Sequence, residues 1–393
     1  MSLFQNEKLS FTHSDKKNTD SMSDEDINMK YVKGDFRIMT ALARYPLKTI
    51  VTMLDSDDYE LQPELRRRHR WYDYKKSHLI ESFIMNVPVP PIFLYEDRPS
   101  HYEVMDGFQR LTAICEFYKD QLVLEGLEKW PELNGRRYSQ LPDRIKKYGI
   151  DRRYLSSVIL LHETAEDDEE AQQLKQMIFE RINSGGVRLT PQESRNAICR
   201  GPLNDLCCKL SRNKYLCRTW GIPESESDEL FENKHYQRME DAELVLRFFA
   251  NRHRRTLMSE RQSLKDYLDK FLRHGNGFSE DVLEKLEILF DQTIELIFNT
   301  FEEKAFWLMR PWNSGWIWWR GATKTVYEPM MHVFSQHIKD AEQILRNREK
   351  FQREIETFYQ ENYHIFKGNE HISQRNIEER TDLFEEFVTN IIG

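Results

Sequence analysis

The sequence IFLYEDRPSHYEVMDGFQRLTAICEFY, at residues 92–118, changes its periodicity part of the way along. Ile92 to Tyr95 and Tyr102 to Met105 are short apolar runs on either side of a charged, turn-rich segment, which predicts two strands. After Gly107 the apolar side chains recur at helical spacing, at Leu111, Ile114, Cys115 and Tyr118. The stretch therefore predicts a strand, a turn, a second strand, a tight glycine turn and a helix.

The flanking sequence extends this pattern over the first half of the chain. Residues 79–84 predict a helix, residues 158–161 predict a strand, and residues 44–54 form an apolar stripe that suits either. Beyond about residue 200 the periodic segments are all helical and no strand is clear. We therefore predict an α+β chain with a polar, disordered tail at 1–30, an α/β domain at 31–200 and an all-helical domain at 201–393.

Composition agrees with a helix-rich globular protein of about two domains. The 393 residues include 31% charged residues but only 15 Gly and 13 Pro, which excludes a collagen-like or linker-dominated chain. The net charge of -9 excludes a uniformly basic nucleic-acid-binding protein but leaves room for a local basic patch. Because no apolar run could span a membrane and no secretory signal is visible, we expect a cytoplasmic protein without a membrane partner. The five cysteines lack the spacing of a zinc site and are expected to be free thiols.

The turn Asp106–Arg110 is a natural place to hold an anion. The first N–H groups of a helix point outward, and the helix dipole favours negative charge there. Arg110 in the first turn could hold a phosphate, and Asp106 could orient that arginine, bind a metal ion or position a water molecule. The alternative is an Asp106 helix cap beside a surface arginine.

Three further groups of residues could contribute to function. Arg181, Asn183, Gln192, Glu193 and Arg195 flank a glycine turn between two helices, where they could converge or simply form a capped helical hairpin with a surface ion pair. Arg66, Arg67, Arg68 and Arg70 beside Trp71 could contact a phosphate backbone or form a solvated turn. Tryptophans at 307, 312, 316, 318 and 319 could stack bases or face a partner, although packing within the helical core is the favoured interpretation.

Four short segments follow one another in order: Pro63-Glu64 with the arginines and Trp71, Leu79–Ser82 with Val87–Ile92, Asp106–Leu111, and Phe179–Gly186 with Gln192–Asn196. Together they resemble the N-terminal domain of GmrSD-type restriction systems, a prokaryotic family with a ParB/sulfiredoxin-like fold and an Asp-Gly-Gln-Gln-Arg signature. The resemblance covers roughly residues 40–200. Arg238–Leu244 and the last helix with Arg380 resemble the helical part that usually follows.

The resemblance implies a nucleotide-binding pocket in the domain at 31–200, associated in the family with nucleotide hydrolysis. By motif match the catalytic candidates are Asp106, Gln109 and Arg110. The nucleotide-binding candidates are Gly107, Arg67, Arg181, Asn183, Gln192, Glu193 and Arg195. Phe108 departs from the signature, which has glutamine there, and this departure would weaken hydrolysis while leaving binding intact.

The resulting hypothesis is a nucleoside triphosphatase of a DNA restriction or phage-defence system, with Mg²⁺ as a candidate cofactor and the base left open. Arg66, Arg68 and Arg70 are then the candidate DNA contacts. The alternative is a non-catalytic nucleotide or DNA sensor that works with a separate nuclease subunit. His332, His337, His364 and His371 lack the surroundings of an HNH site, so a nuclease within this chain is not expected.

Overall fold

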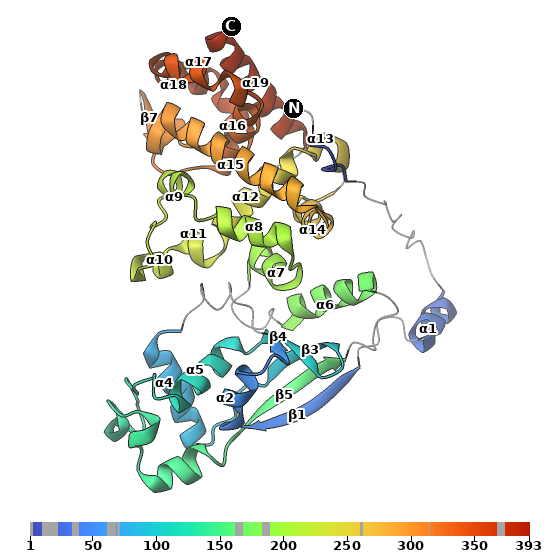
Figure 1. Ribbon diagram of the computed structural model, residues 1–393, viewed down its shortest axis with the longest axis vertical. Coiled ribbons are helices and arrows are strands. Elements are labelled where there is room, and N and C mark those ends of the chain that lie inside the picture. The colour runs from blue at the N-terminus through green and yellow to red at the C-terminus, as the bar shows by residue number, and fades with distance from the viewer. Residues whose placement is uncertain are drawn as a thin grey trace. The chain divides into compact units, whose positions relative to one another are not determined.

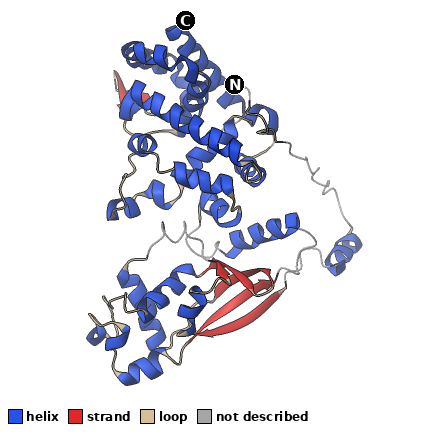
Figure 2. Cartoon of the chain, viewed as in Figure 1, coloured by secondary structure: helices blue, strands red, loops and turns tan. Residues whose placement is uncertain are grey.

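The computed structural model describes residues 3–9, 23–33, 39–60, 68, 71–161, 168–182, 189–259, 262–313, 315–367 and 374–393. The chain divides into two compact units, coloured by residue number in Figure 1. The α/β unit is Ser14–Leu189, and the helical unit combines Met1–His13 with Thr190–Gly393. The expected α+β class is confirmed (Figure 2).

The α/β unit contains a five-stranded sheet in the order β1-β5-β3-β4-β2. The strands are β1 (Thr40–Pro46), β2 (Tyr59–Glu60), β3 (Ile92–Arg98), β4 (His101–Asp106) and β5 (Tyr154–Leu161). β3 and β4 pair antiparallel, β3 runs parallel to β5, and β5 pairs antiparallel with β1. The three predicted strands are confirmed. The ambiguous stripe at 44–54 contains the end of β1 and then helix α2 (Thr49–Leu54).

The strands β3, β4 and β5 have buried side chains on both faces, and helices of the unit cover them. The helices of the α/β unit are α1 (Asp24–Lys33), α4 (Asp73–Ile84), α5 (Phe108–Tyr118) and α6 (Asp168–Ile182), with the short helices η1 (Pro131–Leu133), η2 (Tyr138–Gln140) and the π-helix η3 (Ile145–Ile150). Leu94 and Val104 of the sheet share one hydrophobic core with Ile80 of α4 and Leu111 of α5. Glu103 has the opposite orientation, since successive strand residues alternate, and is buried against α6.

The helical unit is organised around the long helix α15 (Glu280–Phe301), whose Phe290, Ile294 and Ile297 are fully buried. The other helices are α7 (Pro191–Ile198), α8 (Pro202–Leu210), α9 (Lys214–Trp220), α10 (Asp228–Glu232), α11 (Lys234–Gln237), α12 (Glu240–Asn251), α13 (Arg254–Leu257), α14 (Leu264–Gly275), α16 (Lys324–Gln336), α17 (Ala341–Arg346), α18 (Arg348–Phe366) and α19 (Gln374–Ile392), with the short 3-10 helices η6 (Glu302–Lys304) and η7 (Ile338–Asp340). No helix within the described residues is both long enough and apolar enough to cross a bilayer. All five cysteines lie among the described residues, and no disulfide joins any two of them.

The tryptophan-rich segment forms a hairpin, so the prediction that the second half contains no strand was wrong here. β6 (Leu308–Trp312) and β7 (Gly315–Trp319) pair antiparallel. Trp312 is 58% exposed and Trp319 is 44% exposed, so these indoles lie outside the core that was expected to hold them. The segment is rich in tryptophan, which favours strands, but each strand is too short to show a period.

The N-terminal segment differs from the predicted tail, because part of it belongs to the helical unit. Glu7 is fully buried and forms an ion pair with Arg252 and a hydrogen bond with His253. The guanidinium carbon of Arg252 also lies over the ring of Phe4, 4.9 Å from the ring centroid. Burial opposes ionisation of Glu7, but its partners Arg252 and His253 lower the pKa of its carboxyl to about 2. Because these partners are far away in sequence, local composition could not reveal the contact.

Candidate functional site

The reversal between β4 and α5 takes place at a single residue, Gly107. Its φ of +100° lies in the left-handed region, which residues with a side chain adopt at a cost. A Cβ atom at this position would lie only 2.2 Å from Cγ2 of Ile92. The left-handed φ of Gly107 and its contact with Ile92 therefore require glycine at this position.

Asp106 and Arg110 form the polar centre of this turn. Nη2 of Arg110 donates to Oδ2 of Asp106 at 2.5 Å and to the carbonyl oxygen of Pro91 at 3.2 Å. The helix cap is Gly107 and not Asp106, and no side chain caps the first turn of α5. The alternative in which Asp106 caps the helix is therefore wrong, and Asp106 instead orients Arg110.

The guanidinium of Arg110 is fixed on one side by Asp106 and keeps an unpaired donor on the other. Within the described part of the chain its Nε is buried without a hydrogen-bond partner, and its side chain is only 14% exposed. Buried donors in proteins are nearly always paired, so this one calls for a partner from outside the chain. The uncapped N–H groups of α5 lie at the same turn, and both kinds of donor suit an anion.

Gln109 and Phe108 have structural contacts of their own. Oε1 of Gln109 accepts a hydrogen bond from the backbone N–H of Trp71 at 3.3 Å. Phe108 is half-buried and packs against the core of the α/β unit. The turn is thereby linked to the residue that follows the arginine cluster.

The second group of polar candidates is split between the units. Arg181 lies exposed near the end of α6, and Asn183 falls outside the described residues. Gln192, Glu193 and Arg195 all lie on α7 of the helical unit, and none is more than 3% exposed. The cap in the alternative, a capped helical hairpin with a surface ion pair, is present, because Thr190 and Glu193 form a capping box, whereas the turn of that hairpin lies outside the described residues.

Arg195 is engaged by partners that the sequence does not place beside it. Its Nε donates to Oδ1 of Asp269 at 2.5 Å, and its Nη1 donates to Oε2 of Glu243 at 3.2 Å and to Oε1 of Gln192 at 3.0 Å. The ion pair expected at the surface is thus buried. These contacts and the capping box engage Arg195, Glu193 and Oε1 of Gln192 within the helical unit, while Nε2 of Gln192 is buried without a hydrogen-bond partner among the described residues. The predicted contact of these residues with nucleotide stays a prediction.

Glu243 extends the contacts of Arg195 into a buried charge network, defined here as Arg195, Glu243, Arg247, Asp269, Lys324 and Glu328. Nε of Arg247 and Nζ of Lys324 donate to Glu243 at 2.9 and 3.0 Å, and Arg247 also pairs with Glu328. Burial opposes ionisation of Glu243, yet Arg247, Lys324 and Arg195 hold the pKa of its carboxyl far below its usual value. Two of the resembling segments, Gln192–Asn196 and Arg238–Leu244, therefore meet in this network.

Only one of the arginines in the cluster at 66–70 lies within the described residues. Arg66, Arg67 and Arg70 fall outside the described residues. Arg68 is 1% exposed, so its side chain is not a surface contact for DNA, in contrast to the expectation. Burial of a long cationic side chain could not be read from a run of four arginines.

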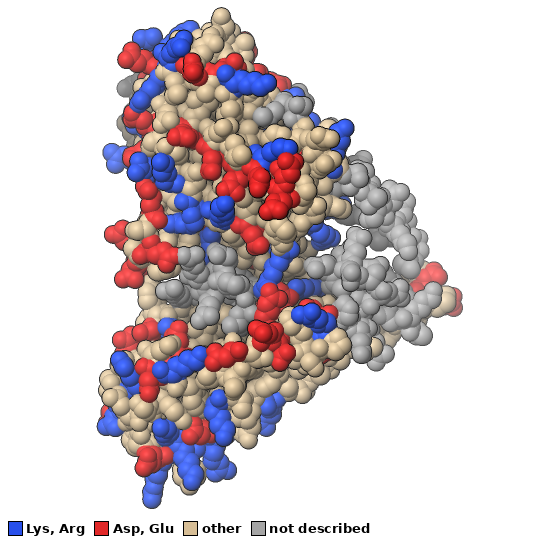
Figure 3. All heavy atoms as spheres, viewed as in Figure 1, with Lys and Arg blue, Asp and Glu red and all other residues tan. Residues whose placement is uncertain are grey.

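Sequence reasoning missed a basic surface on the α/β unit. Residues 129–153 contain eight Lys or Arg and only three Asp or Glu. We define the basic surface as Lys129, Arg136, Arg137, Arg144, Lys146, Lys147 and Arg152, none of which forms a salt bridge with any described residue. Figure 3 shows Lys and Arg gathered at the end of the α/β unit at the bottom of the view. The sequence did contain a signal for this surface, because residues 129–153 are basic whereas the whole chain has a net charge of -9.

A second missed feature is the buried pair of Glu103 on β4 and Lys175 on α6. The ammonium of Lys175 also lies 5.4 Å from the ring centroid of Tyr95. Among the described residues no group of three His, Cys, Asp or Glu side chains is arranged to hold a metal ion.

Comparison with known families supports the resemblance stated from the motifs. Residues 47–199 match the family described as GmrSD restriction endonuclease, N-terminal domain. Comparison with curated proteins and with solved structures gave no match. The matched range contains strands β2 to β5, the Gly107 turn and α7, while β1 lies just before it. Residues 47–199, less than half of the chain, are therefore similar to the N-terminal domain of GmrSD restriction endonucleases.

Proposed function

We propose that the α/β unit binds a nucleoside triphosphate at the Asp106–Arg110 turn and that the chain acts on or senses DNA in a restriction or phage-defence system. The observation that carries the proposal is the orientation of Arg110. Asp106 holds one side of its guanidinium, while Nε remains buried without a partner among the described residues. An arginine fixed in this way can donate to a phosphate without losing its own orientation.

The same contacts favour binding over hydrolysis. The Asp106 carboxylate is engaged by Arg110, the Gln109 oxygen by Trp71, and Phe108 replaces a polar side chain with a ring packed on the core. None of the three is placed to activate water as it stands. A nucleotide sensor that works with a separate nuclease is therefore the function that the geometry supports best, and hydrolysis is the second candidate. Any Mg²⁺ would enter with the phosphates, beside Asp106.

Replacing Arg110 with Ala is expected to weaken binding of ATP, GTP or CTP about 10- to 100-fold, the usual loss when a charged hydrogen bond is removed. Isothermal titration with each nucleotide, with and without Mg²⁺, measures the change. Arg98→Ala removes an exposed arginine of β3 and serves as the matched control. Phosphate release measured with and without DNA separates the two candidate functions. A wild-type protein that binds no nucleotide would contradict both.

The basic surface is the DNA contact that we propose in place of the arginine cluster. Lys147 and Arg152 both lie over the ring of Tyr148, which is 51% exposed, and Lys146 lies over Tyr138. Unpaired cations beside exposed aromatic rings suit a phosphate backbone and its bases.

The double variant Lys147→Ala, Arg152→Ala is expected to lower DNA affinity equally for all sequences and to reduce the salt dependence of log K by about two, one for each lost phosphate contact. Fluorescence anisotropy over a range of salt concentrations measures both quantities. Removing Lys285 and Arg346, exposed cations of the helical unit, gives a control with the same change in charge. If both double variants have the same slope of log K against log salt concentration, the basic surface is not the DNA contact.

A further inference from the structure

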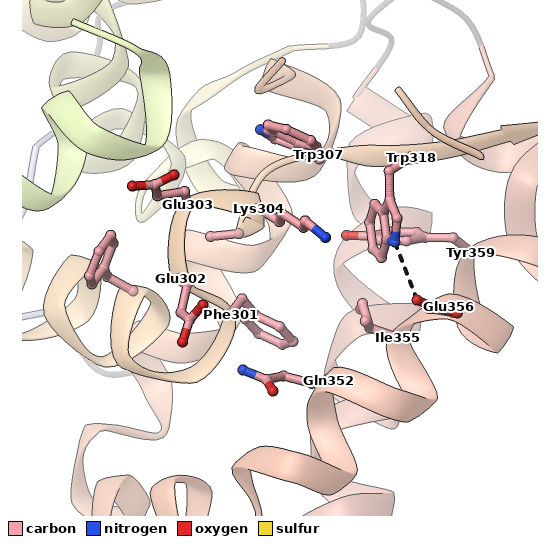
Figure 4. Close-up of a pocket in the computed structure, with 12 residues that line it drawn as sticks. Phe301, Glu302, Glu303, Lys304, Trp307, Trp318, Gln352, Ile355, Glu356 and Tyr359 are labelled. Carbon is pink, nitrogen blue, oxygen red and sulfur yellow. Dashed lines mark hydrogen bonds between the residues drawn. The ribbon is translucent and has the colours of Figure 1, made fainter. Parts of the chain in front are cut away.

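The helical unit contains a cavity that plays no part in the function proposed above. It has a volume of about 490 Å³ and lies between the end of α15, η6, β7 and α18 (Figure 4). Its size falls within the range of sites for small organic ligands.

The walls of this cavity are largely aromatic. Phe301 of α15, Trp307, Trp318 of β7 and Tyr359 of α18 all line it. The rings of Trp318 and Tyr359 meet edge to face, with centroids 6.0 Å apart and planes at 90°. The indole of Trp318 is fixed by its Nε1, which donates to Oε1 of Glu356 at 3.2 Å. A planar ligand would therefore enter between rings whose positions are already set.

The hydroxyl of Tyr359 is the unusual group of the cavity. Tyr359 is 1% exposed, and its hydroxyl has no hydrogen-bond partner among the described residues. Burial raises the pKa of this phenol, so the hydroxyl stays protonated and can both donate and accept. Figure 4 shows it pointing toward the ammonium of Lys304, whose exposed side chain can move aside for a ligand.

The rim of the cavity is fixed by an unusual backbone. Glu302 has φ +57° and ψ -146°, a conformation that is costly for a residue with a side chain. Its carboxylate pairs with Arg348 of α18. The strain is thus placed at the mouth of the cavity, as is common at binding sites.

The charges select among possible ligands. Lys304 lines the cavity with an exposed ammonium and would repel an organic cation, while the carboxylates of Glu303 and Glu356 disfavour a free anion. The ligand is therefore expected to be a neutral ring. It would have hydrogen-bond acceptors for Lys304 and Tyr359 and an amino group that can donate to a carboxylate. We propose that this cavity binds a purine or pyrimidine base, either in a nucleoside or as an unpaired base of a nucleic acid.

The two sources of the base are separated by the choice of probe. Nucleosides lack phosphate, so their binding is independent of Arg110, and failure of the proposed nucleotide site leaves this proposal untouched. Single-stranded oligonucleotides that differ only in one base or one abasic position report an unpaired base. Equilibrium dialysis serves for the four nucleosides and anisotropy for the strands.

Tyr359→Phe removes only the unpartnered hydroxyl and keeps the ring, so the fold is expected to be retained. It should weaken binding of the base about 3- to 10-fold, as for one lost hydrogen bond. Trp318→Leu should weaken it about 10-fold or more, as for one lost stacking partner. Tyr267→Phe is the matched control, because that buried hydroxyl donates to the carbonyl of Ala250 at 2.6 Å, away from the cavity.

Binding of nucleosides with this pattern of variants supports the proposal with a free ligand. Binding of strands alone with the same pattern supports it with an unpaired base. The proposal is overturned if neither probe binds, or if binding is the same in wild type and Tyr359→Phe. Thermal unfolding of each variant shows whether a loss of binding reflects a loss of fold.

Discussion

Replacing Glu243 with Gln is expected to lower the free energy of unfolding by about 3–5 kcal/mol, the usual loss when one partner of a buried ion pair is removed. Glu243 accepts from Arg195, Arg247 and Lys324, so its neutralisation leaves three cations to share Asp269 and Glu328. Chemical denaturation at neutral pH measures the loss. Arg195 and Arg247 then keep only Asp269 and Glu328 as buried carboxylate partners, while Lys324, whose side chain is 32% exposed, loses its contact with Glu243.

The effect has a defined dependence on pH. The pKa of the Glu243 carboxyl is lowered in the folded protein, so its contribution is complete above the unfolded value of 4.5 and decreases as the pH falls below it. Wild type and variant should therefore converge in acid. Glu342→Gln is the matched control, since Glu342 pairs with Arg346 at 3.3 Å on a fully solvated surface. A loss below about 1 kcal/mol, the range of exposed ion pairs, would show that the network adds little to stability.

Gly107→Ala is expected to destabilise the α/β unit by about 3 kcal/mol or more and to abolish nucleotide binding. The left-handed backbone alone costs about 1–2 kcal/mol for a residue with a Cβ. The new methyl group would also overlap Ile92 at 2.2 Å and crowd Nη2 of Arg110 at 3.0 Å. Relief of this overlap requires a shift of β3 or α5, and overpacking of this kind costs about 1–3 kcal/mol more.

Gly135 separates the two contributions to the Gly107 result. It has φ +82°, but nothing lies within 4 Å of the position of its Cβ. Gly135→Ala should therefore cost only the backbone penalty and leave nucleotide binding unchanged. Thermal and chemical unfolding of both variants, with titration of nucleotide, measure the difference. Equal losses of stability would mean that the contact with Ile92 is easily accommodated.

The strand, turn and helix around Gly107 could be predicted from sequence because their signals are local. Apolar runs, a single glycine and helical spacing all fall within residues 92–118. The hairpin at 308–319 could not be predicted in this way, since its strands are too short to show a period. Its tryptophans were expected in a core, but three of them are more than a third exposed.

The candidate site was predicted in part. The pairing of Asp106 with Arg110 follows from their helical spacing and is present. The contacts of Arg195 with Asp269 and Glu243 span more than forty residues of sequence, with separations of 74 and 48, and no local pattern encodes them. Gln192, Glu193 and Arg195 lie near a glycine turn and were therefore predicted to form a second half of the site. In the structure they are buried in the helical unit, and residue spacing in the sequence does not reveal such burial.

The contact of Glu7 with Arg252 has a consequence for how the protein is made. The two residues are 245 positions apart, and the whole α/β unit lies between them in the sequence. During synthesis the α/β unit is complete before most of the helical unit has left the ribosome. The N-terminal segment must therefore wait, with Phe4 and Glu7 unpaired, until α12 and the residues after it emerge. Its docking closes a loop of 245 residues, and a nascent chain would show protection of this segment from proteolysis only after Arg252 has left the ribosome.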